Sequence, residues 1–415
     1  MKIFLGFGKS KVDIEINNSN LLGILKPNDV PVKLTGVDEV KRAMKEPIGS
    51  PRLKEIVKPG KKVVIITSDI TRPMPSKIVL PVILEELLEA GVSEEDITVV
   101  FSLGSHRKHT EEEKRALVGE DIYNKIKCID SDARDAVHLG KSSKGTPVDI
   151  FRPVVEADFR ICLGNIEYHY FAGYSGGAKA IMPGVSTRGA IQANHSRMIE
   201  DGARAGILEG NPVREDIDEV ADFVPIDFIL NVVLDENKNI IKAVAGHYIK
   251  AHREGCRFLD SIYKVKIPDK ADIVIVSPGG YPKDINLYQA QKALDNSAHA
   301  VKDGGIVILV ASCKEGLGES VFERWMLEAE SPESMITKIH SKFELGGHKA
   351  AAIAMVLRKA RVFLVSDMEA DFVRKLFLEP YTNVKDAIAC AFNQLGNNAK
   401  VLVMPYGGST LPVLK

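Results

Sequence analysis

Three residues in the middle of the chain, His169, Lys179 and His195, could carry out chemistry at one site. They follow one another at intervals of 10 and 16 residues, within a segment from 161 to 195 that also contains the Gly-rich turn 174–178. Imidazole can act as a base or bind a metal ion, and a lysine amine can form a covalent bond with a carbonyl or acyl group. Exposed backbone N–H groups in such a turn would suit a phosphate. The segment therefore predicts a bound cofactor.

Further reactive side chains follow two other predicted strands. One strand leads into Asp69 and Arg72, and the next leads into His106. Ligands of parallel sheets bind beyond the carboxyl ends of the strands, so we expect one pocket that also includes His169. Two histidines could act as bases on opposite sides of a substrate, and an arginine could hold its carboxylate. The plainer alternatives are that Asp69 caps a helix, that Arg72 forms a surface ion pair, and that His106 is solvated. We expect His109 to face solvent or to cap the next helix.

Alternating strand and helix patterns must position these residues. β-branched runs alternate with amphipathic helical patterns, which is typical of a parallel sheet with helices on both faces. In the first half we expect strands at 61–69, 96–106 and 158–169, helices at 75–91 and 111–119, and a hairpin over 228–247. In the second half we expect strands at 271–280, 304–313, 361–367 and 400–408, and helices at about 284–301, 318–329, 349–359 and 385–395.

The polar stretch 263–273 is the best candidate for a linker between these halves. We therefore predict an α/β protein of two α/β domains with mostly parallel sheets and the active site in the cleft between them. The first domain, 1–265, would bind the cofactor and carry out catalysis. The second, 266–415, would contribute substrate and cofactor contacts, and the extreme C-terminal tail is a candidate to return to the first domain.

Composition excludes several classes of function. The chain has 415 residues and a net charge of −1, so no general attraction to nucleic acid or to an anionic membrane is expected. Its apolar runs are far shorter than the roughly 20 residues of a membrane helix. Its five cysteines are scattered without CxxC pairs, which favours a reducing cytoplasm over a disulfide framework or a zinc site. The sequence thus indicates a cytoplasmic protein with a small-molecule partner.

Taken together, the motifs resemble the nickel-dependent lactate racemase family, whose members hold a nickel-pincer nucleotide. The long central segment is the specific part, and the resemblance covers nearly the whole chain. In order, the matching motifs are DITRP (69–73), GSHR (104–107), EYHYFAGYSGGAKAIMPGV (167–185), NH (194–195), LEGNPVRED (208–216) and YQAQK (288–292).

The resemblance implies an isomerase, namely a racemase or epimerase of a 2-hydroxy acid that transfers hydride to and from its cofactor. His106 and His169 would be the alternating bases. Lys179 would carry the cofactor, a pyridinium thioamide/thiocarboxylate mononucleotide, as a covalent adduct, and His195 would be the protein ligand to nickel. Proteins of cofactor synthesis are implied partners. The residues expected to bind substrate are Arg72, Lys292, Tyr288 and Gln289, and those expected around the cofactor are Asp69, Ser175, Gly176 and Gly177.

The chain departs from the family pattern where the substrate side chain would bind. Lactate racemases of the family place a tryptophan there, after the HKA turn, but this chain has AAIAMVLRKARV at 351–362. Its one tryptophan, Trp325, belongs to an earlier helix and is expected to be a packing residue. Malate or a larger 2-hydroxy acid is therefore a candidate beside lactate. An NAD-dependent oxidoreductase and a non-catalytic nickel-cofactor carrier are the alternative functions, although the chain has no GxGxxG fingerprint.

Overall fold

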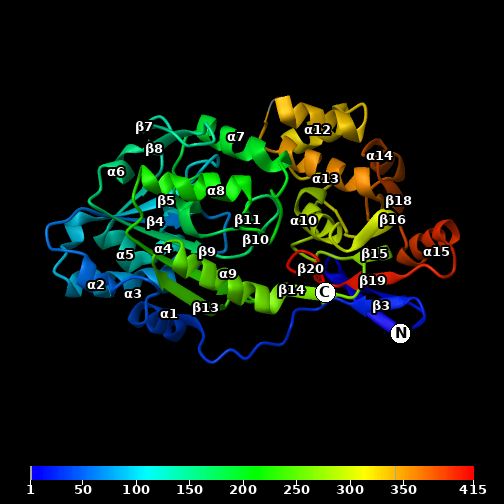
Figure 1. The fold of residues 1–415 in the computed structure, drawn as a ribbon, viewed down its shortest axis with the longest axis horizontal. Helices are drawn as coiled ribbons and strands as arrows, with labels where there is room; N and C mark the ends of the chain where they lie inside the picture. The colour runs from blue at the N-terminus through cyan, green and yellow to red at the C-terminus, as the bar shows by residue number, and fades with distance from the viewer. Residues whose placement is uncertain (1, 342) are drawn as a thin grey trace. The chain divides into compact units, whose positions relative to one another are not determined.

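A computed structural model describes residues 2–341 and 343–415, with the side chain of His340 left out. The chain divides into two compact units (Figure 1). Unit 1 consists of Met1–Asp29 and Ser261–Lys415, and unit 2 consists of Val30–Asp260. The first 29 residues thus belong to the same unit as the C-terminal part of the chain, which differs from the predicted division into 1–265 and 266–415.

Unit 2 is built on a six-stranded sheet in the order β13-β12-β9-β4-β5-β6. All neighbours pair in parallel except β12 and β13, which form the expected antiparallel hairpin. The central strands are almost continuously buried, as strands covered on both faces require, and β4 and β5 are rich in β-branched residues. The strands are β4 (Val63–Ser68), β5 (Ile97–Ser102), β6 (Lys127–Asp130), β9 (Phe159–Asn165), β12 (Phe228–Leu234) and β13 (Ile240–Gly246).

Helices pack against both faces of this sheet. On one face, α1 (Gly36–Lys45), α2 (Leu53–Ile56), α3 (Ser76–Glu89), α4 (Glu111–Val118) and α5 (Glu120–Lys125) enclose the main core. On the other face, α9 (Lys250–Tyr263) approaches so closely that a Cβ at Gly255 would lie 2.3 Å from Ile166. The remaining elements are β7 (Ala136–Lys141), β8 (Pro147–Phe151), α6 (Arg152–Val155), β10 (Tyr168–His169), β11 (Gly173–Tyr174), α7 (Arg188–Ser196), α8 (Pro212–Glu219) and the short 3₁₀ helices η1 (Glu94–Asp96), η2 (Gly177–Ala180), η3 (Arg197–Ile199) and η4 (Val220–Asp222).

Unit 1 contains a second, fully parallel six-stranded sheet in the order β18-β17-β16-β15-β19-β3. Its strands are β3 (Leu21–Ile24), β15 (Ala271–Val276), β16 (Val301–Val310), β17 (Arg361–Val365), β18 (Glu379–Tyr381) and β19 (Val401–Met404). Its helices are α10 (Leu287–Ser297), α11 (Ser320–Glu328), α12 (Pro332–Ser341), α13 (Gly347–Lys359), α14 (Ala370–Lys375) and α15 (Val384–Leu395). The prediction of α/β architecture with mostly parallel sheets is confirmed.

The N-terminal hairpin explains why the first 29 residues belong to unit 1. β1 (Lys2–Phe7) and β2 (Ser10–Glu15) form an antiparallel pair, and their inward side chains Leu5 and Ile14 are buried in the core of unit 1. At the hairpin tip, the Gly8 N–H donates to Asp284 Oδ2 at 2.6 Å. Hydrophobic burial and this bond together fix the hairpin on the second half of the chain.

The stretch 263–273, predicted as a linker, lies next to the unit boundary at Ser261, but it contains a strand. β14 (Lys264–Ile267) pairs in parallel with β20 (Leu411–Leu414), and β15 begins soon after. The C-terminal tail is therefore held within unit 1 by backbone hydrogen bonds, and it does not join unit 2. β14 has the polar sequence KVKI because it is short and only its last residue, Ile267, is fully buried.

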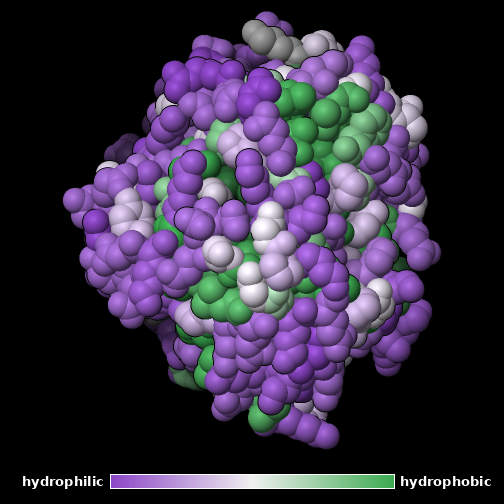
Figure 2. Space-filling model, turned by 90° about the vertical axis from the view of Figure 1, so that its left-hand side faces the viewer, coloured by the Kyte–Doolittle hydropathy of each residue, from purple (hydrophilic) through white to green (hydrophobic). Residues whose placement is uncertain are grey.

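Most apolar side chains lie in the cores. The face shown in Figure 2 is mainly hydrophilic, with separate smaller hydrophobic areas. Of the helices in the described ranges, none combines the length and apolar composition of a membrane span.

Candidate active site

The adjacent strands β4, β5 and β9 deliver the predicted residues of unit 2 to one edge of its sheet. Asp69 directly follows β4, and His106 lies just after β5. Their side chains meet, with His106 Nδ1 2.6 Å from Asp69 Oδ2. Thr71 Oγ1 also donates to Asp69, at 2.8 Å. Asp69 therefore orients a histidine and does not cap α3, whose N-cap is Pro75. The His106 side chain is 36% exposed, so it contacts both Asp69 and solvent.

The charge of Asp69 is stabilised despite its burial. Desolvation raises the pKa of this carboxyl group, but the hydrogen bond and charge of His106, the Thr71 hydrogen bond and the charge of Arg72 together outweigh it. The net pKa of Asp69 lies below its ordinary value, so the group is a carboxylate at neutral pH. Because a carboxylate only accepts, His106 must hold its proton on Nδ1, which leaves the lone pair on Nε2.

His169 lies in a small hairpin formed by β10 and β11, in which it pairs with Gly173. Tyr168 and Tyr174 anchor this hairpin by donating to the same oxygen of Asp260, at 2.8 and 2.7 Å. His169 Nδ1 accepts a hydrogen bond from the Ala172 N–H at 3.3 Å. His169 therefore has the opposite arrangement to His106, because here the lone pair is on Nδ1.

The predicted metal ligand His195 lies near the end of α7 and is buried. Its Nδ1 is 3.0 Å from the Asn194 side-chain oxygen, and the Asn194 amide nitrogen donates to Asp216 at 2.7 Å. This chain of bonds orients the amide oxygen toward His195 and places the ring proton on Nδ1. Phe171 contacts both histidine rings, with ring-centroid distances of 4.5 Å to His169 and 4.9 Å to His195. The structure thus brings His169 and His195 close together.

Lys179 lies in the short helix η2, and its residue is only half-buried. Desolvation of the ammonium group, together with the charges of Arg214 and Arg72, nevertheless holds the pKa of Lys179 well below its ordinary value, while Glu167 opposes the shift. Lowering the pKa increases the share of neutral amine, which is the nucleophilic form. The charge of Arg72 thus acts on Lys179, although they come from different loops of unit 2.

Side chains from three other elements, α8, α9 and β12, hold the turn before Lys179 by hydrogen bonds. The fully buried Arg214 donates to the carbonyl oxygens of Tyr174, Ala172 and Gly176. His252 Nε2 donates to the Ser175 backbone oxygen at 2.8 Å, because a carbonyl oxygen can only accept. Burial and the charges of Arg214 and Arg253 hold the pKa of His252 well below its ordinary value.

This arrangement corrects one expectation about the turn. The Ser175 N–H donates to the Glu167 oxygen and the Gly177 N–H to Asn231 Oδ1, so neither amide is exposed for a phosphate. Gly176 and Gly177 both have positive φ, and a Cβ at Gly176 would lie 2.8 Å from Asn231. The close packing of the turn therefore requires glycine. Contacts of Ser175, Gly176 and Gly177 with a cofactor stay a prediction.

The predicted substrate residues Tyr288, Gln289 and Lys292 belong to unit 1, at the start of α10. Asn286 caps this helix by accepting the Gln289 N–H at 3.0 Å. Lys349 Nζ donates to the Tyr288 oxygen at 2.6 Å and lies 3.9 Å from the centre of its ring. Gln289 is exposed and Lys292 half-buried. The structure places these three residues together, in a different unit from the histidines.

His109 is not solvated, and it does not cap a helix, so that expectation is wrong. Its side chain is 1% exposed, and Nδ1 lies 2.6 Å from Asp130 Oδ1. The cap of α4 is Thr110, whose side chain accepts the Glu113 N–H. The prediction for Trp325 is confirmed, since its ring is buried and Nε1 donates to Glu344 at 2.7 Å.

The sequence did not reveal the residues whose hydrogen bonds hold the Gly-rich turn and orient His195. Arg214 and Asn194 fall within motifs that had been recognised, but no role follows from their spacing. Asn231 and His252 lie 54 or more residues away from the turn that they hold. Only the adjacency of Asn194 to His195 was a usable signal, because a side-chain acceptor beside a metal-binding histidine is a common arrangement.

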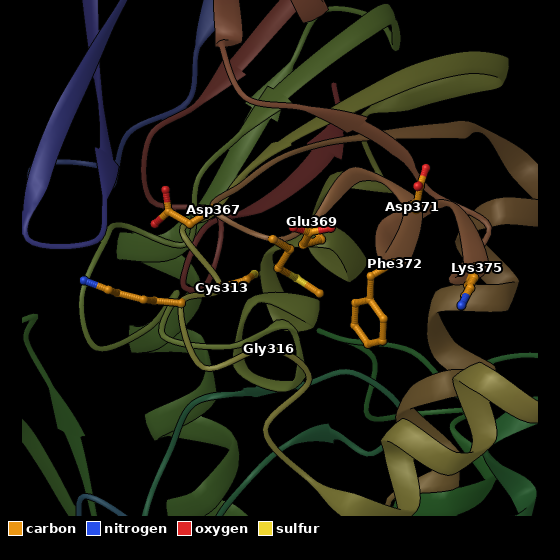
Figure 3. A pocket seen from close by; sticks show the side chains of 9 residues that line it. Cys313, Gly316, Asp367, Glu369, Asp371, Phe372 and Lys375 are labelled. Atoms are coloured by element: carbon orange, nitrogen blue, oxygen red, sulfur yellow. The ribbon is translucent and has the colours of Figure 1, made fainter.

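One cavity of about 480 Å³ lies in unit 1, at the ends of β16 and β17 (Figure 3). It is lined by Asp367, Glu369 and Phe372 among others, and none of the predicted site residues lines it. Within the described part of the chain, no group of three or more His, Cys, Asp or Glu side chains could hold a metal ion.

Comparisons with known proteins cover almost the whole chain. Residues 7–206 match the lactate racemase N-terminal domain, and residues 266–411 match the lactate racemase C-terminal domain. The chain is 37% identical to a lactate racemase of Thermoanaerobacterium thermosaccharolyticum, over 99% of this chain and 98% of the relative. It is 33% identical to a lactate racemase of Lactiplantibacillus plantarum, over 98% of both chains.

Solved structures agree with these matches. The lactate racemase apoprotein from T. thermosaccharolyticum superimposes with a TM-score of 0.92 at 36% identity, covering 100% of both chains. A Thermotoga maritima protein has the same fold, with a TM-score of 0.66 at 18% identity over 92% of this chain and 100% of its own.

The fold and these matches define an isomerase of the racemase class, built from two α/β units. The chain belongs to the lactate racemase family. The alternatives of an NAD-dependent oxidoreductase and of a non-catalytic carrier are not supported.

Proposed function

We propose that this chain racemises a 2-hydroxy acid, with lactate as the first substrate to test because its relatives carry that name. The observation that carries the proposal is the opposite hydrogen bonding of two histidines. Nδ1 of His106 bonds to a carboxylate, whereas Nδ1 of His169 accepts a backbone N–H. A substrate hydroxyl between two such rings would meet one acceptor and one donor.

His106 is arranged to take a proton. Its Nε2 has the lone pair, and the Asp69 carboxylate stabilises the imidazolium ion that forms. Neutral His169 has its proton on Nε2 and would donate a hydrogen bond to the substrate oxygen. To act as a full acid, His169 must first be protonated at Nδ1, and this breaks the 3.3 Å bond from Ala172. The two bases are therefore unequal in the state described here.

The residues of unit 2 fit a nickel-pincer nucleotide. Lys179, with its lowered pKa, would be the covalent attachment point, and His195 would bind nickel through Nε2, because Nδ1 is engaged by Asn194. When bound, the cofactor would supply the acceptor and donor of hydride from the substrate Cα. The chain itself would position substrate and move the hydroxyl proton.

Arg72 and Lys292 are the proposed clamps for the substrate carboxylate, with Tyr288 and Gln289 beside Lys292. Arg72 is exposed next to Asp69, so its guanidinium is available to an anion. Trp325 is buried by packing in unit 1 and is not a candidate for contact with the substrate. We therefore include malate and larger 2-hydroxy acids in the substrate test.

The experiment uses chain produced together with the cofactor-synthesis proteins. We expect an intact-mass adduct that maps to Lys179 and is absent from Lys179→Ala, and we expect interconversion of L- and D-lactate or of another enantiomer pair by chiral chromatography. A substrate deuterated at Cα should give product that retains the deuterium.

Two results would contradict the proposal at different points. If the chain racemises substrate while Lys179 is unmodified, the proposed covalent attachment of a cofactor to Lys179 is wrong. If chain that has the cofactor bound interconverts the enantiomers of none of the tested 2-hydroxy acids, the proposed racemase reaction is wrong. Loss of the Cα deuterium to water during racemisation would exclude hydride transfer.

A further inference from the structure

His109, which the proposed reaction does not use, is part of a buried hydrogen-bonded chain behind the site. Both oxygens of Asp130, at the end of β6, bind this residue: Oδ1 is 2.6 Å from Nδ1, and Oδ2 accepts the His109 N–H at 3.0 Å. The His109 ring packs edge-on against Phe101 of β5, at 5.2 Å between centroids. The ring therefore has one well-defined orientation.

The second ring nitrogen of His109 is also engaged. Its Nε2 lies 3.1 Å from the backbone nitrogen of Ile70, which can only donate. The lone pair must therefore be on Nε2 and the proton on Nδ1, facing Asp130. Protonation of Nε2 would place two donors against each other. The geometry thus selects the neutral Nδ1–H form of His109.

The Ile70 N–H follows directly on Asp69, the carboxylate that orients His106. The chain of contacts runs from Asp130 through His109 to Ile70, and then through Asp69 to the catalytic base His106. We propose that His109 is a positioning residue for the Asp69–His106 pair: by accepting the Ile70 N–H it fixes the loop after β4 and so aims the base. This inference rests on the proposed function, because His106 is the base there.

The physical reason is that the loop has few other supports. Asp69 to Arg72 form a tight turn in which the Arg72 N–H donates to the Asp69 oxygen at 3.1 Å. Neighbouring Ile70 has an exposed side chain, so packing does not hold it in place. A misplacement of about 1 Å in a catalytic group can cost on the order of 100-fold in rate. One backbone bond from a buried ring of fixed orientation prevents such a displacement.

The test compares substitutions of His109 in cofactor-loaded chain. His109→Gln can place an amide oxygen near the Nε2 position and so keep an acceptor for Ile70, whereas His109→Leu has none. We expect His109→Leu to lower kcat by about 10- to 100-fold, because the base is no longer aimed, and to raise KM as well, because Arg72 lies in the same loop as Asp69. His109→Gln should recover most of kcat.

The matched control is His138, which forms the same type of pair with Asp149, at 2.6 Å, in the β7–β8 hairpin. His138→Leu also removes a histidine–aspartate bond but has no link to the loop after β4. It should leave kcat within twofold. A kcat in His109→Leu that matches the control, or a His109→Gln as slow as His109→Leu, would overturn the proposal.

A spectroscopic measurement keeps the inference testable even if His109→Leu fails to fold or if the chain proves not to be a racemase. Long-range ¹H–¹⁵N correlation of histidine-labelled wild-type chain, without cofactor, reports which ring nitrogen has the proton. We expect His109 as the Nδ1–H form, and we expect the His106 Nδ1–H signal to weaken in His109→Gln less than in His109→Leu. His109 observed as the Nε2–H form would refute the proposed chain of bonds irrespective of activity.

Discussion

At the scale of single residues, the histidines of unit 2 differ in which partner occupies Nδ1. His106 and His109 each bind a carboxylate there, His195 binds the Asn194 amide oxygen, and His169 accepts a backbone N–H. These partners decide which ring nitrogen has the lone pair, and hence whether a ring can accept a proton, bind a metal or brace a loop. The same residue type therefore has several different tasks within about 90 positions of sequence.

Lys179 gives a residue-scale prediction about pH and stability. Its pKa is lowered in the folded chain, chiefly by desolvation. The unfolded chain then binds more protons than the folded one between the lowered pKa and about 10.4, so the free energy of unfolding rises with pH in that window. Lys179→Met removes the cost of burying the ammonium group. It should raise the melting temperature of cofactor-free chain at neutral pH by at least about 2 °C.

The gain from Lys179→Met should shrink as pH rises above the lowered pKa toward about 10.4, because the folded chain is then already neutral at Lys179 and the unfolded chain progressively loses its proton there. Differential scanning calorimetry between pH 6 and 10 measures this. The control is Lys125→Met, on the exposed end of α5, which should shift the melting temperature little at any pH. A gain that is constant across the pH range would show that packing, and not charge, is responsible.

At the scale of elements, the turn 172–177 is held by side chains that come from other parts of unit 2. Arg214 on α8 donates to three of its carbonyl oxygens and pairs with Asp218. Asn231 on β12 accepts the Gly177 N–H, and His252 on α9 donates to the Ser175 backbone oxygen. The turn has little regular structure of its own. Its conformation, and with it the direction of Lys179, therefore depends on these three elements.

Arg214→Met tests this dependence. It leaves carbonyl oxygens of the turn without donors, which costs about 1–3 kcal/mol for each buried unsatisfied group, while Asp218 keeps its ion pair with Arg253 at 2.6 Å. We expect faster hydrogen exchange at residues 172–180 and less adduct at Lys179. The matched control is Arg160→Met, since Arg160 is also buried and donates to three carbonyl oxygens, at Val154, Val155 and Ala157. It should lower stability without a selective change in the turn; equal exchange in both variants would refute the assigned role of Arg214.

At the scale of the whole molecule, one compact unit is formed by both ends of the chain. Residues 1–29 supply the β1–β2 hairpin and the edge strand β3 to the unit that otherwise begins at Ser261. Four hairpin side chains, Ile3, Leu5, Ile14 and Ile16, are at most 5% exposed. At about 2 kcal/mol each, their burial is comparable with the whole stability of a typical domain, roughly 5–15 kcal/mol.

Deletion of residues 1–29 should therefore unfold unit 1 and leave unit 2 folded. The one tryptophan, Trp325, is buried in unit 1 and makes fluorescence selective for that unit. We expect a red-shifted emission in the deletion variant together with protease-resistant fragments that contain residues from 30 to 260. Unchanged emission would mean that unit 1 does not depend on the hairpin.

The sequence predicted the local features well because they depend on short-range patterns. Short, mainly apolar runs identified β4, β5, β9 and the β12–β13 hairpin, and their order placed Asp69, His106 and His169 at one edge of a parallel sheet. The bond between Asp69 and His106 follows from that topology. Short elements such as β14, β18 and α14 were missed, because too few residues show the period that identifies an element.

What the sequence by itself determined is the set of reactive residues and the strands that present them, since residue type and hydrophobic period are local properties. Only the tertiary structure decided how each group is tuned. Partners distant in sequence set the hydrogen bonds of His109, the burial of Arg214 and the lowered pKa of Lys179, and the N-terminal hairpin joined the opposite end of the chain. Spacing in sequence contains no information on these contacts, because they arise from packing between elements that the folded core brings together.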